Sequence, residues 1–214
     1  MRSYGQYCGV ARALDVVGDR WTLLIVRELF LLGASRYTDL RNGLPGIATN
    51  LLVARLRELE EAGIIAREDA PPPIAATLYY LTDRGEELEP VIRALGLWGG
   101  PLMSKPAAND DAFRSYWLAR PLGLHLTDRT PEAPPVTIEI RTGDEPMIVE
   151  TLNGAIHVRR GSAQQPDAVL TGPPHLVIGA LTGRLSLADA MAAGAQYDGD
   201  PAILRRVQRR PRPE

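Results

Sequence analysis

The sequence is poor in cysteine and has no long apolar run. Among its 214 residues, Cys8 is the only cysteine, which excludes an intrachain disulfide and fits a reducing cytoplasm. The chain has no run of about 18 apolar residues and no basic, apolar leader, so we expect neither a membrane span nor secretion. The formal net charge is only −2, so nonspecific adhesion to nucleic acid should be weak. These features predict a cytoplasmic protein.

Residues that could build a catalytic or metal site are also scarce. The histidines, His125, His157 and His175, are far apart, lack metal-ligand spacing and have no cysteine pair near them. No serine lies in a nucleophile-elbow motif, and no glycine-rich loop precedes a lysine as at a phosphate site. The sequence therefore predicts no enzyme activity, no metal and no cofactor.

Residues 46–62 are predicted to form an amphipathic helix. Leu52, Leu56 and Leu59 fall on one stripe of this helix. The remaining surface is small, polar and basic where the helix begins, and its side chains are Thr49, Asn50, Val53, Ala54 and Arg57. Such a helix suits the DNA major groove, although the same pattern also fits an ordinary surface helix.

The flanking segments favour DNA recognition. Residues 35–41 are predicted to form a short helix and residues 42–46 a turn, which together with the next helix gives a helix-turn-helix. Gly63 is a natural helix stop. Residues 64–68 and 77–81 are predicted to form two strands, separated by a proline-rich segment. A hairpin that directly follows a recognition helix is a wing. Residues 36–57 carry four arginines and one aspartate, a net charge of +3.

Five motifs follow one another along residues 7–103, and they are Cys8–Leu29, Arg36–Leu40, Leu44–Ile47, Leu51–Glu60 and Tyr80–Gly85. Together they resemble the HxlR family of bacterial winged-helix transcription regulators. The resemblance implies a homodimer on a pseudo-palindromic operator, with one recognition helix in each of two major grooves. One departure is Ala48, where the family usually has serine. The helix start is then weaker by roughly 1 kcal/mol unless Thr49 caps it.

Particular side chains of the predicted winged helix are expected to contact DNA. Base edges or adjacent phosphates are expected to meet Thr49, Asn50 and Arg57. Arg36 is expected to hold the DNA backbone, and Arg67 to reach from the wing to the flanking minor groove or its phosphates. Arg55 lies beside the apolar stripe, so we expect it to form a structural ion pair instead.

Cys8 is a candidate redox sensor. In several regulators of the resembled family, a cysteine near the N-terminus senses oxidants or electrophiles. Here the cysteine stands just ahead of a predicted helix, whose dipole would favour the thiolate. The alternative is an inert, buried thiol.

The sequence predicts a domain boundary after a helix at residues 83–98. Residues 83–98 are predicted to form one helix, begun by a capping box of Asp83 and Glu86 and kinked at Pro90. A linker at 105–111 follows, so we expect a DNA-binding and dimerisation domain at 1–104 and a second domain at 112–214. Surplus apolar side chains are expected at a two-fold interface, and they are Leu29, Phe30, Leu95 and Trp98.

Residues 112–214 predict an α+β layer of an antiparallel sheet followed by helices. Strands are expected at 136–141, 147–152, 155–160 and 168–171, with a hairpin at Asn153-Gly154. An amphipathic helix is expected around residues 113–118, and further helices at 174–181, 186–193 and 201–207. The helix at 186–193 begins with a pattern that resembles a capping box, Ser186 with Asp189 three residues later.

The segments 168–173, 181–191 and 197–201 are similar to the sterol-carrier-protein type of domain. The resemblance implies an apolar cavity between sheet and helices that accepts lipids or other hydrophobic molecules. Candidate lining residues are Trp117, Met147, Val149, Leu181 and Met191, each of which could instead be ordinary core.

The whole sequence thus predicts an α+β protein in which a winged helix-turn-helix precedes a small ligand domain. The favoured function is a dimeric, ligand-responsive repressor of transcription, with double-stranded operator DNA and a hydrophobic effector as partners and no membrane association. The alternative is a carrier of lipids or hydrophobic small molecules, or an interaction protein, that uses its winged helix only for dimerisation.

Overall fold

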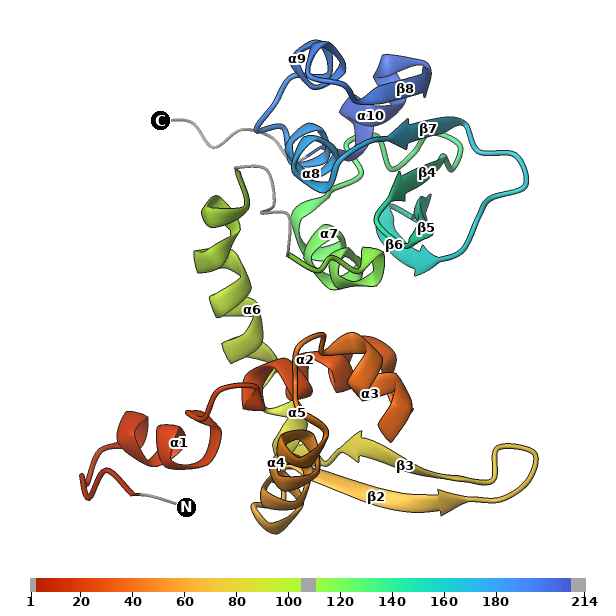
Figure 1. Ribbon diagram of the computed structural model, residues 1–214. Helices are drawn as coiled ribbons and strands as arrows, with labels where there is room; N and C mark the ends of the chain where they lie inside the picture. The colour runs from red at the N-terminus through yellow and green to blue at the C-terminus, as the bar shows by residue number, and fades with distance from the viewer. Residues whose placement is uncertain (1–2, 105–110, 209–214) are drawn as a thin grey trace. The chain divides into compact units, whose positions relative to one another are not determined.

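A computed structural model describes residues 3–104 and 111–208, and the chain divides into two compact units, residues 1–95 and 96–214 (Figure 1). The first unit holds α1 (Gly9–Val17), α2 (Thr22–Leu32), β1 (Ser35–Arg36), α3 (Tyr37–Gly43), α4 (Thr49–Glu61), β2 (Ile65–Ala70), β3 (Ala76–Leu81) and α5 (Asp83–Glu86). The boundary falls within α6 (Glu89–Gly99), which is followed by η1 (Gly100–Ser104). Most of the predicted linker, residues 105–110, lies outside the described residues.

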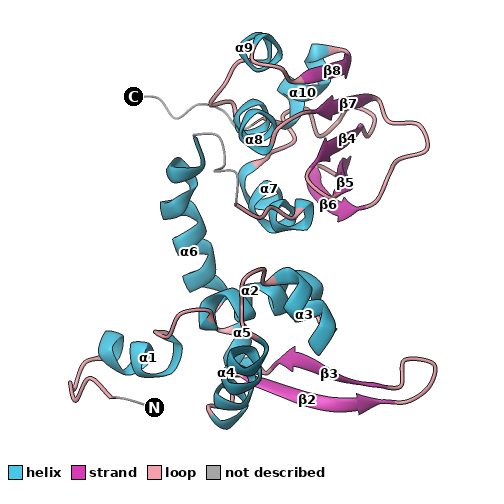
Figure 2. Ribbon diagram, in the orientation of Figure 1, coloured by secondary structure: helices cyan, strands magenta, loops and turns pink. Residues whose placement is uncertain are grey.

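The second unit continues with η2 (Ser115–Leu118), α7 (Ala119–His125), β4 (Thr137–Thr142), β5 (Glu145–Leu152), β6 (Ala155–Arg160), β7 (Ala168–Thr171), α8 (Pro174–Thr182), α9 (Leu187–Ala192), β8 (Gln196–Gly199) and α10 (Pro201–Val207). Figure 2 shows how these helices and strands alternate. Across the described ranges, no helix combines the length and apolar character needed to cross a membrane.

The core of the first unit is built around the predicted stripe of α4. Leu52, Leu56 and Leu59 are buried, and they belong to one cluster with Leu40 and Leu44 of the helix-turn-helix. The predicted end of α4 is also confirmed. Gly63 has a φ of +68°, its amide donates to the carbonyl of Glu60, and the next amide donates to the carbonyl of Leu59. This is a Schellman motif, which glycine allows because it has no Cβ.

The prediction of a helix from residue 35 was wrong at its first two residues. Ser35 and Arg36 form β1, whose backbone pairs with Tyr79 and Leu78 of β3. The sheet order is β1-β3-β2, so β1 extends the wing hairpin by a third strand. The helix begins only at Tyr37, because the preceding backbone is held extended by pairing with a segment about forty residues away, which no local pattern reveals.

The predicted single helix over 83–98 is two helices. α5 ends at Glu86, and α6 begins at Glu89 with Pro90 in its first turn, where a missing N–H is tolerated. The predicted capping box of Asp83 and Glu86 was also wrong. The N-cap is Thr82, whose hydroxyl accepts a hydrogen bond from the amide of Gly85 at 3.2 Å.

The sheet of the second unit has the order β6-β5-β4-β7-β8, and the predicted antiparallel pairing is found between all neighbours except one pair. β4 and β7 pair in parallel, with Ile138 opposite Ala168, whereas the other neighbours are antiparallel. β8, which was not predicted, pairs with β7. The parallel pair arises because residues 161–167 carry the chain from edge strand β6 past β5 and β4 without a helix.

A buried carboxylate holds this crossover. Glu139, on the central strand β4, accepts a hydrogen bond from the amide of Ala163 at 2.8 Å and from Nε of Arg141 at 2.7 Å. Its neighbours Ile138 and Ile140 are fully buried and point to the opposite face of the sheet. The crossover segment is therefore fixed by a polar contact on one face while apolar packing fills the other.

Two local signals of the second unit are confirmed, the hairpin turn and the cap at Ser186. Asn153 and Gly154 have φ values of +51° and +74°, as a two-residue hairpin turn requires. The hydroxyl of Ser186 accepts a hydrogen bond from the amide of Asp189 at 3.0 Å and so caps α9. The amphipathic helix expected around residues 113–118 is shorter and tighter, because η2 is a 3₁₀ turn that leads into α7.

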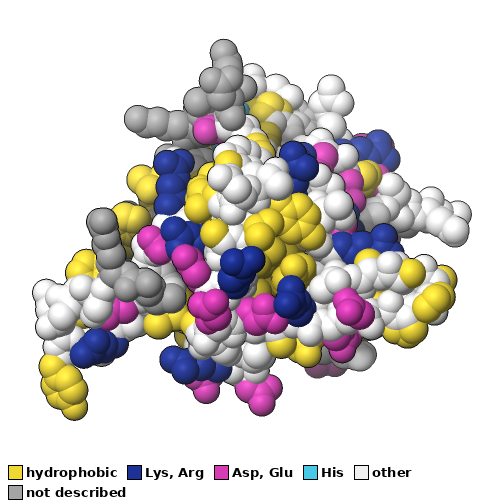
Figure 3. Space-filling model, turned by 60° about the horizontal axis from the view of Figure 1, so that its bottom comes forward, with side chains coloured by type: hydrophobic (Ala, Val, Ile, Leu, Met, Phe, Trp, Pro, Cys, Tyr) yellow, Lys and Arg dark blue, Asp and Glu magenta, His cyan; other side chains and the backbone are white. Residues whose placement is uncertain are grey.

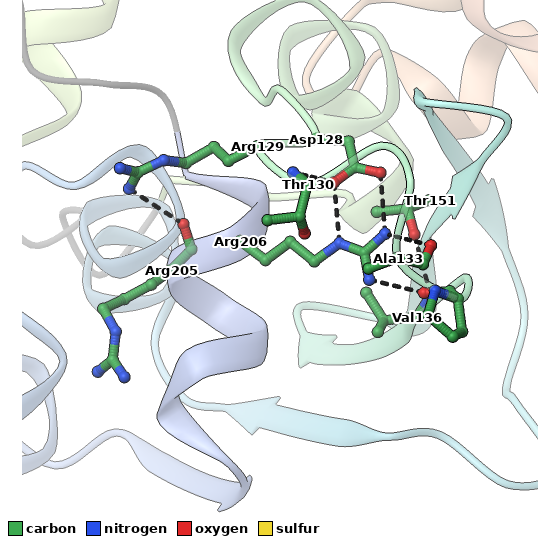
Figure 4. Close-up of polar contacts among 9 residues, drawn as sticks. Asp128, Arg129, Thr130, Ala133, Val136, Thr151, Arg205 and Arg206 are labelled. Carbon is green, nitrogen blue, oxygen red and sulfur yellow. Dashed lines mark hydrogen bonds and ion pairs between the residues drawn. The ribbon is translucent and has the colours of Figure 1, made fainter.

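A buried ion pair anchors α10 (Figure 4). Nε and Nη2 of Arg206 donate to the two carboxylate oxygens of Asp128, at 2.8 and 3.0 Å. Arg206 also donates to the carbonyl groups of Ala133 and Pro134. The hydrogen bonds that Arg206 donates to the Asp128 carboxylate lower the pKa of Asp128. Because both side chains are nearly inaccessible, the pair holds the last helix to the segment that precedes β4.

Candidate DNA-binding surface

The outward face of α4 is exposed over its whole length. With the leucines of α4 turned inward, the exposed side chains of its first turns are Thr49, Asn50, Val53, Ala54 and Arg57. Figure 3 views the molecule from the side on which α4 and the wing lie, and basic, acidic and hydrophobic side chains are interspersed there. The structure therefore brings Thr49, Asn50 and Arg57 to one surface, as predicted.

The start of α4 has no side-chain cap from its N-cap residue, Ala48. The side-chain oxygen of Asn50 accepts a hydrogen bond from the amide of Leu51 at 3.0 Å. The hydroxyl of Tyr37 donates to the carbonyl oxygen of Thr49 at 3.2 Å, which ties the first helix of the helix-turn-helix to the start of the second. The backbone is thus held from α3 while the side chains of Thr49 and Asn50 remain exposed.

The arginines of this surface fall into two groups. Arg57 is exposed, and so is Arg41 at the end of α3. Neither side chain has a hydrogen-bond or ion-pair partner among the described residues. Arg36 instead donates from Nη2 to the carbonyl of Ile74 at the wing tip, at 3.0 Å. Arg67 lies 3.2 Å from Glu60 of α4. No contact was predicted for Arg41, one of the four arginines in residues 36–57, because the freedom of its side chain depends on segments distant in the sequence.

Arg55 forms the structural ion pair that was expected. Its Nη1 atom lies 2.5 Å from the carboxylate of Asp19, in the loop between α1 and α2, and also contacts the carboxylate of Glu58. Its Nε atom is buried and has no acceptor among the described residues. Arg55 therefore joins α4 to the preceding loop and is not available to DNA.

The wing carries little free positive charge. Beside Arg67, strand β2 exposes Glu68 and Asp69, and Asp69 accepts a hydrogen bond from the hydroxyl of Thr77 at 2.6 Å. The tip consists of Pro71, Pro72, Pro73, Ile74 and Ala75, all exposed. A contact of Arg67 with DNA requires it to leave Glu60, which is a small cost because exposed pairs contribute about 0–1 kcal/mol.

Apolar side chains are exposed on α6 and α1. On α6 they include Trp98, which is 76% exposed, and Leu95. Val10 and Leu14 are exposed on one side of α1. The expectation that Leu29 belongs to a subunit interface was wrong, because it is buried in the core of the first unit, against which Phe30 packs.

Cys8 is the N-cap residue of α1, and it is exposed. The backbone amides of Ala11 and Val10, at the start of α1, lower the pKa of the Cys8 thiol because they favour its charged form. The expectation that the helix start favours the thiolate agrees with this direction. The alternative of a buried, inert thiol does not fit the exposure of the side chain.

The candidate ligand residues of the second unit do not share one environment. Met147 and Val149 project from the same face of β5, opposite Ile140 and Ile138 of β4. Leu181 lies on α8, which packs against β4. These three candidates are fully buried, so they are close-packed core in this conformation. Trp117 is half-buried against Phe113 and Tyr116, and Met191 is 45% exposed.

A metal centre has no support in the described ranges, where no group of three or more histidine, cysteine or acidic side chains is arranged to hold an ion. His125 is tied by its Nδ1 atom to the carbonyl of Pro121, at 2.7 Å. His157 lies on β6 and His175 in the first turn of α8. The three histidines are thus on separate elements.

The helix-turn-helix part of the chain is similar to known proteins. Residues 16–106 match a family model described as HxlR-like helix-turn-helix. An uncharacterized HTH-type transcriptional regulator of Synechocystis is 40% identical over 91 residues, which are 42% of this chain and 67% of the relative. The uncharacterized HTH-type transcriptional regulator YvaP of Bacillus subtilis is 34% identical over 87 residues, which are 41% of this chain and 80% of the relative. A solved structure of a putative MarR-family transcriptional regulator from Porphyromonas gingivalis covers 47% of this chain and 97% of its own, with 27% identity and a TM-score of 0.41.

The position of Cys8 predicts an acidic thiol. In the folded protein, its alkylation by iodoacetamide should reach half of the maximal rate at a lower pH than in urea-unfolded protein, because only folding supplies the helix amides. The measurement is the alkylation rate against pH, followed by mass spectrometry. The unfolded chain is the matched control, since Cys8 is its only thiol. Identical pH profiles in the two states would contradict the assignment.

Proposed function

Because the chain belongs to the HxlR-like helix-turn-helix family of transcriptional regulators, which are not enzymes, we propose that this DNA-binding protein is a ligand-responsive repressor. It binds a pseudo-palindromic operator as a homodimer and works in the cytoplasm. The observation that carries the proposal is the exposed polar face of α4, which presents Thr49, Asn50 and Arg57 to solvent.

The dimensions of this face suit a half-site. Thr49 and Arg57 are eight residues apart, which is about 12 Å along a helix. That length covers between three and four base pairs at about 3.4 Å each. Asn50 offers both a donor and an acceptor, the pair that adenine presents in the major groove, and Arg57 can reach guanine or a phosphate. These contacts lie in the first turns of α4, the part of a recognition helix that reads bases.

A homodimer follows from the apolar surface that one chain leaves in water. Trp98 and Leu95 of α6 and Val10 and Leu14 of α1 are exposed in the single chain. A two-fold interface would bury them and set two copies of α4 about 34–36 Å apart, one turn of the duplex. A dimer over two such half-sites excludes other proteins from the same stretch of DNA, which favours repression.

The second unit is proposed to be the sensor, with a fold of the sterol-carrier type. Its candidate residues Met147, Val149 and Leu181 come from a strand and a helix that face one apolar layer, but they are closed to solvent. A hydrophobic ligand therefore requires the helices to move apart from the sheet. That movement supplies the difference between two states to which an effector can couple.

Oxidation of Cys8 is a second candidate signal. The exposed thiol and its lowered pKa support it. In this case the N-terminal helix α1, which begins beside Cys8 and carries Val10 and Leu14, would pass a covalent change to the dimer interface.

Asn50→Ala and Arg57→Ala should each weaken operator binding by about 1–3 kcal/mol and leave the stability of the protein unchanged, since both side chains are exposed. Fluorescence anisotropy with operator DNA measures the affinity. Arg159→Ala, which removes the same charge from the second unit, is the matched control and should bind normally. If both α4 variants keep the original affinity, the reading face lies elsewhere.

Trp98→Glu should dissociate the dimer while the chain stays folded, because this side chain is already mostly in water within one chain. Loss of an apolar contact of this size should raise the dissociation constant about a hundredfold or more. Analytical ultracentrifugation measures the assembly, and Trp98→Phe is the control that keeps an aromatic contact. A stable wild-type monomer at micromolar concentration would rule out this interface.

A hydrophobic molecule retained by the purified protein, identified by native mass spectrometry, should change operator affinity by about 5- to 150-fold. Operator DNA should change the affinity for that molecule by the same factor, because binding linkage is reciprocal. Isothermal titration with operator or with unrelated DNA measures both directions. Binding of the molecule without any change in operator affinity would favour a carrier or storage role for the second unit.

A further inference from the structure

The outward face of α4 includes Val53, an exposed side chain that cannot form a hydrogen bond. Val53 is 43% exposed, whereas the core below it is already filled by Leu52, Leu56 and Leu59. Within α4, all of whose residues are described, Val53 is the one large apolar side chain in the exposed class. Next to it lies Ala54, also exposed. The middle of the face is therefore apolar and small, whereas both of its ends are polar.

The position of Val53 on α4 limits which part of a DNA half-site its side chain can contact. It stands four residues after Thr49 and four before Arg57, about one turn or 6 Å from each. If those two residues contact neighbouring parts of a half-site, Val53 lies over the base pair between them. Ala54 has no atom beyond Cβ, so the base edges can come close to the helix at this point.

Val53 can neither donate nor accept a hydrogen bond, and the major groove offers one apolar feature to such a side chain, the C5-methyl group of thymine. We propose that Val53 packs against a thymine methyl group and makes a T·A base pair, at the centre of each half-site, a requirement of recognition. This assignment rests on the proposed function, since it needs α4 to enter the major groove.

The same contact acts against cytosine. A C·G pair presents an N4 amino donor where thymine has its carbonyl oxygen, and cytosine lacks the methyl group. Val53 would desolvate that donor without offering an acceptor, which is unfavourable. A protein partner is a poorer fit for this site, because one valine between Thr49, Asn50 and Arg57 is far smaller than the apolar patches that bind proteins.

The test begins with selection of the operator from a random duplex library by the full-length protein. Each thymine of the selected half-site is then replaced by deoxyuridine, which removes only the methyl group. At one central thymine, the wild type should bind about fourfold more weakly per half-site, as expected for one buried methyl group. Val53→Ala should bind the thymine operator about fourfold more weakly per half-site and should show no further loss with deoxyuridine.

The control variant is Leu152→Ala, which truncates an exposed aliphatic side chain (49% exposed) in the second unit. It should keep the full penalty for deoxyuridine. A selected operator without thymine at the centre of its half-site, or a penalty that persists in Val53→Ala, overturns the role of Val53 and leaves the proposed function intact. Failure of any sequence to be enriched overturns both.

Discussion

Burial of three leucines on one side of α4 is the constraint on which the rest of the DNA-binding surface depends. Leu52, Leu56 and Leu59 are almost completely removed from water, and each such burial stabilises the fold by roughly 1.5–3 kcal/mol. Since a helix turns about 100° per residue, turning these three inward decides which side chains point outward. The outward set, which includes Asn50, Val53 and Arg57, is therefore a consequence of core packing.

Polar contacts then divide the arginines of the helix-turn-helix into structural and available groups. Arg55 lies between Asp19 and Glu58, so its charge is neutralised and used to join α4 to the α1–α2 loop. Arg36 is held at the wing tip. The positive charge counted along the sequence thus exceeds the charge free to meet phosphates, which resides chiefly on Arg41 and Arg57. Affinity for DNA should accordingly depend more on fit than on net charge.

In the second unit, apolar side chains pack on one face of the sheet, and the crossover segment, residues 161–167, is held on the other face. The isoleucines of β4 share one face of the sheet with Met147 and Val149 of β5, and Glu139 fixes the crossover segment on the opposite face. The pair of Asp128 and Arg206 joins α10 to the segment before β4, and the buried Leu204 and Val207 of the same helix add apolar contacts.

Local patterns were sufficient to predict the amphipathic helix α4, its glycine stop, the wing strands, the Asn153-Gly154 hairpin and the pairing of Arg55 with nearby Glu58. Each of these depends on side chains within a few turns of one another or on one face of a helix. They failed where backbone pairing joins distant segments, at β1, at β8 and in the parallel pair of β4 and β7. Local patterns also did not reveal that the side chain of Arg41 is exposed and unpaired, or that Met147 is fully buried. Exposure and partnership are properties of the folded neighbourhood, since the atoms that bury or bind a side chain come from segments that the chain brings together only when it folds.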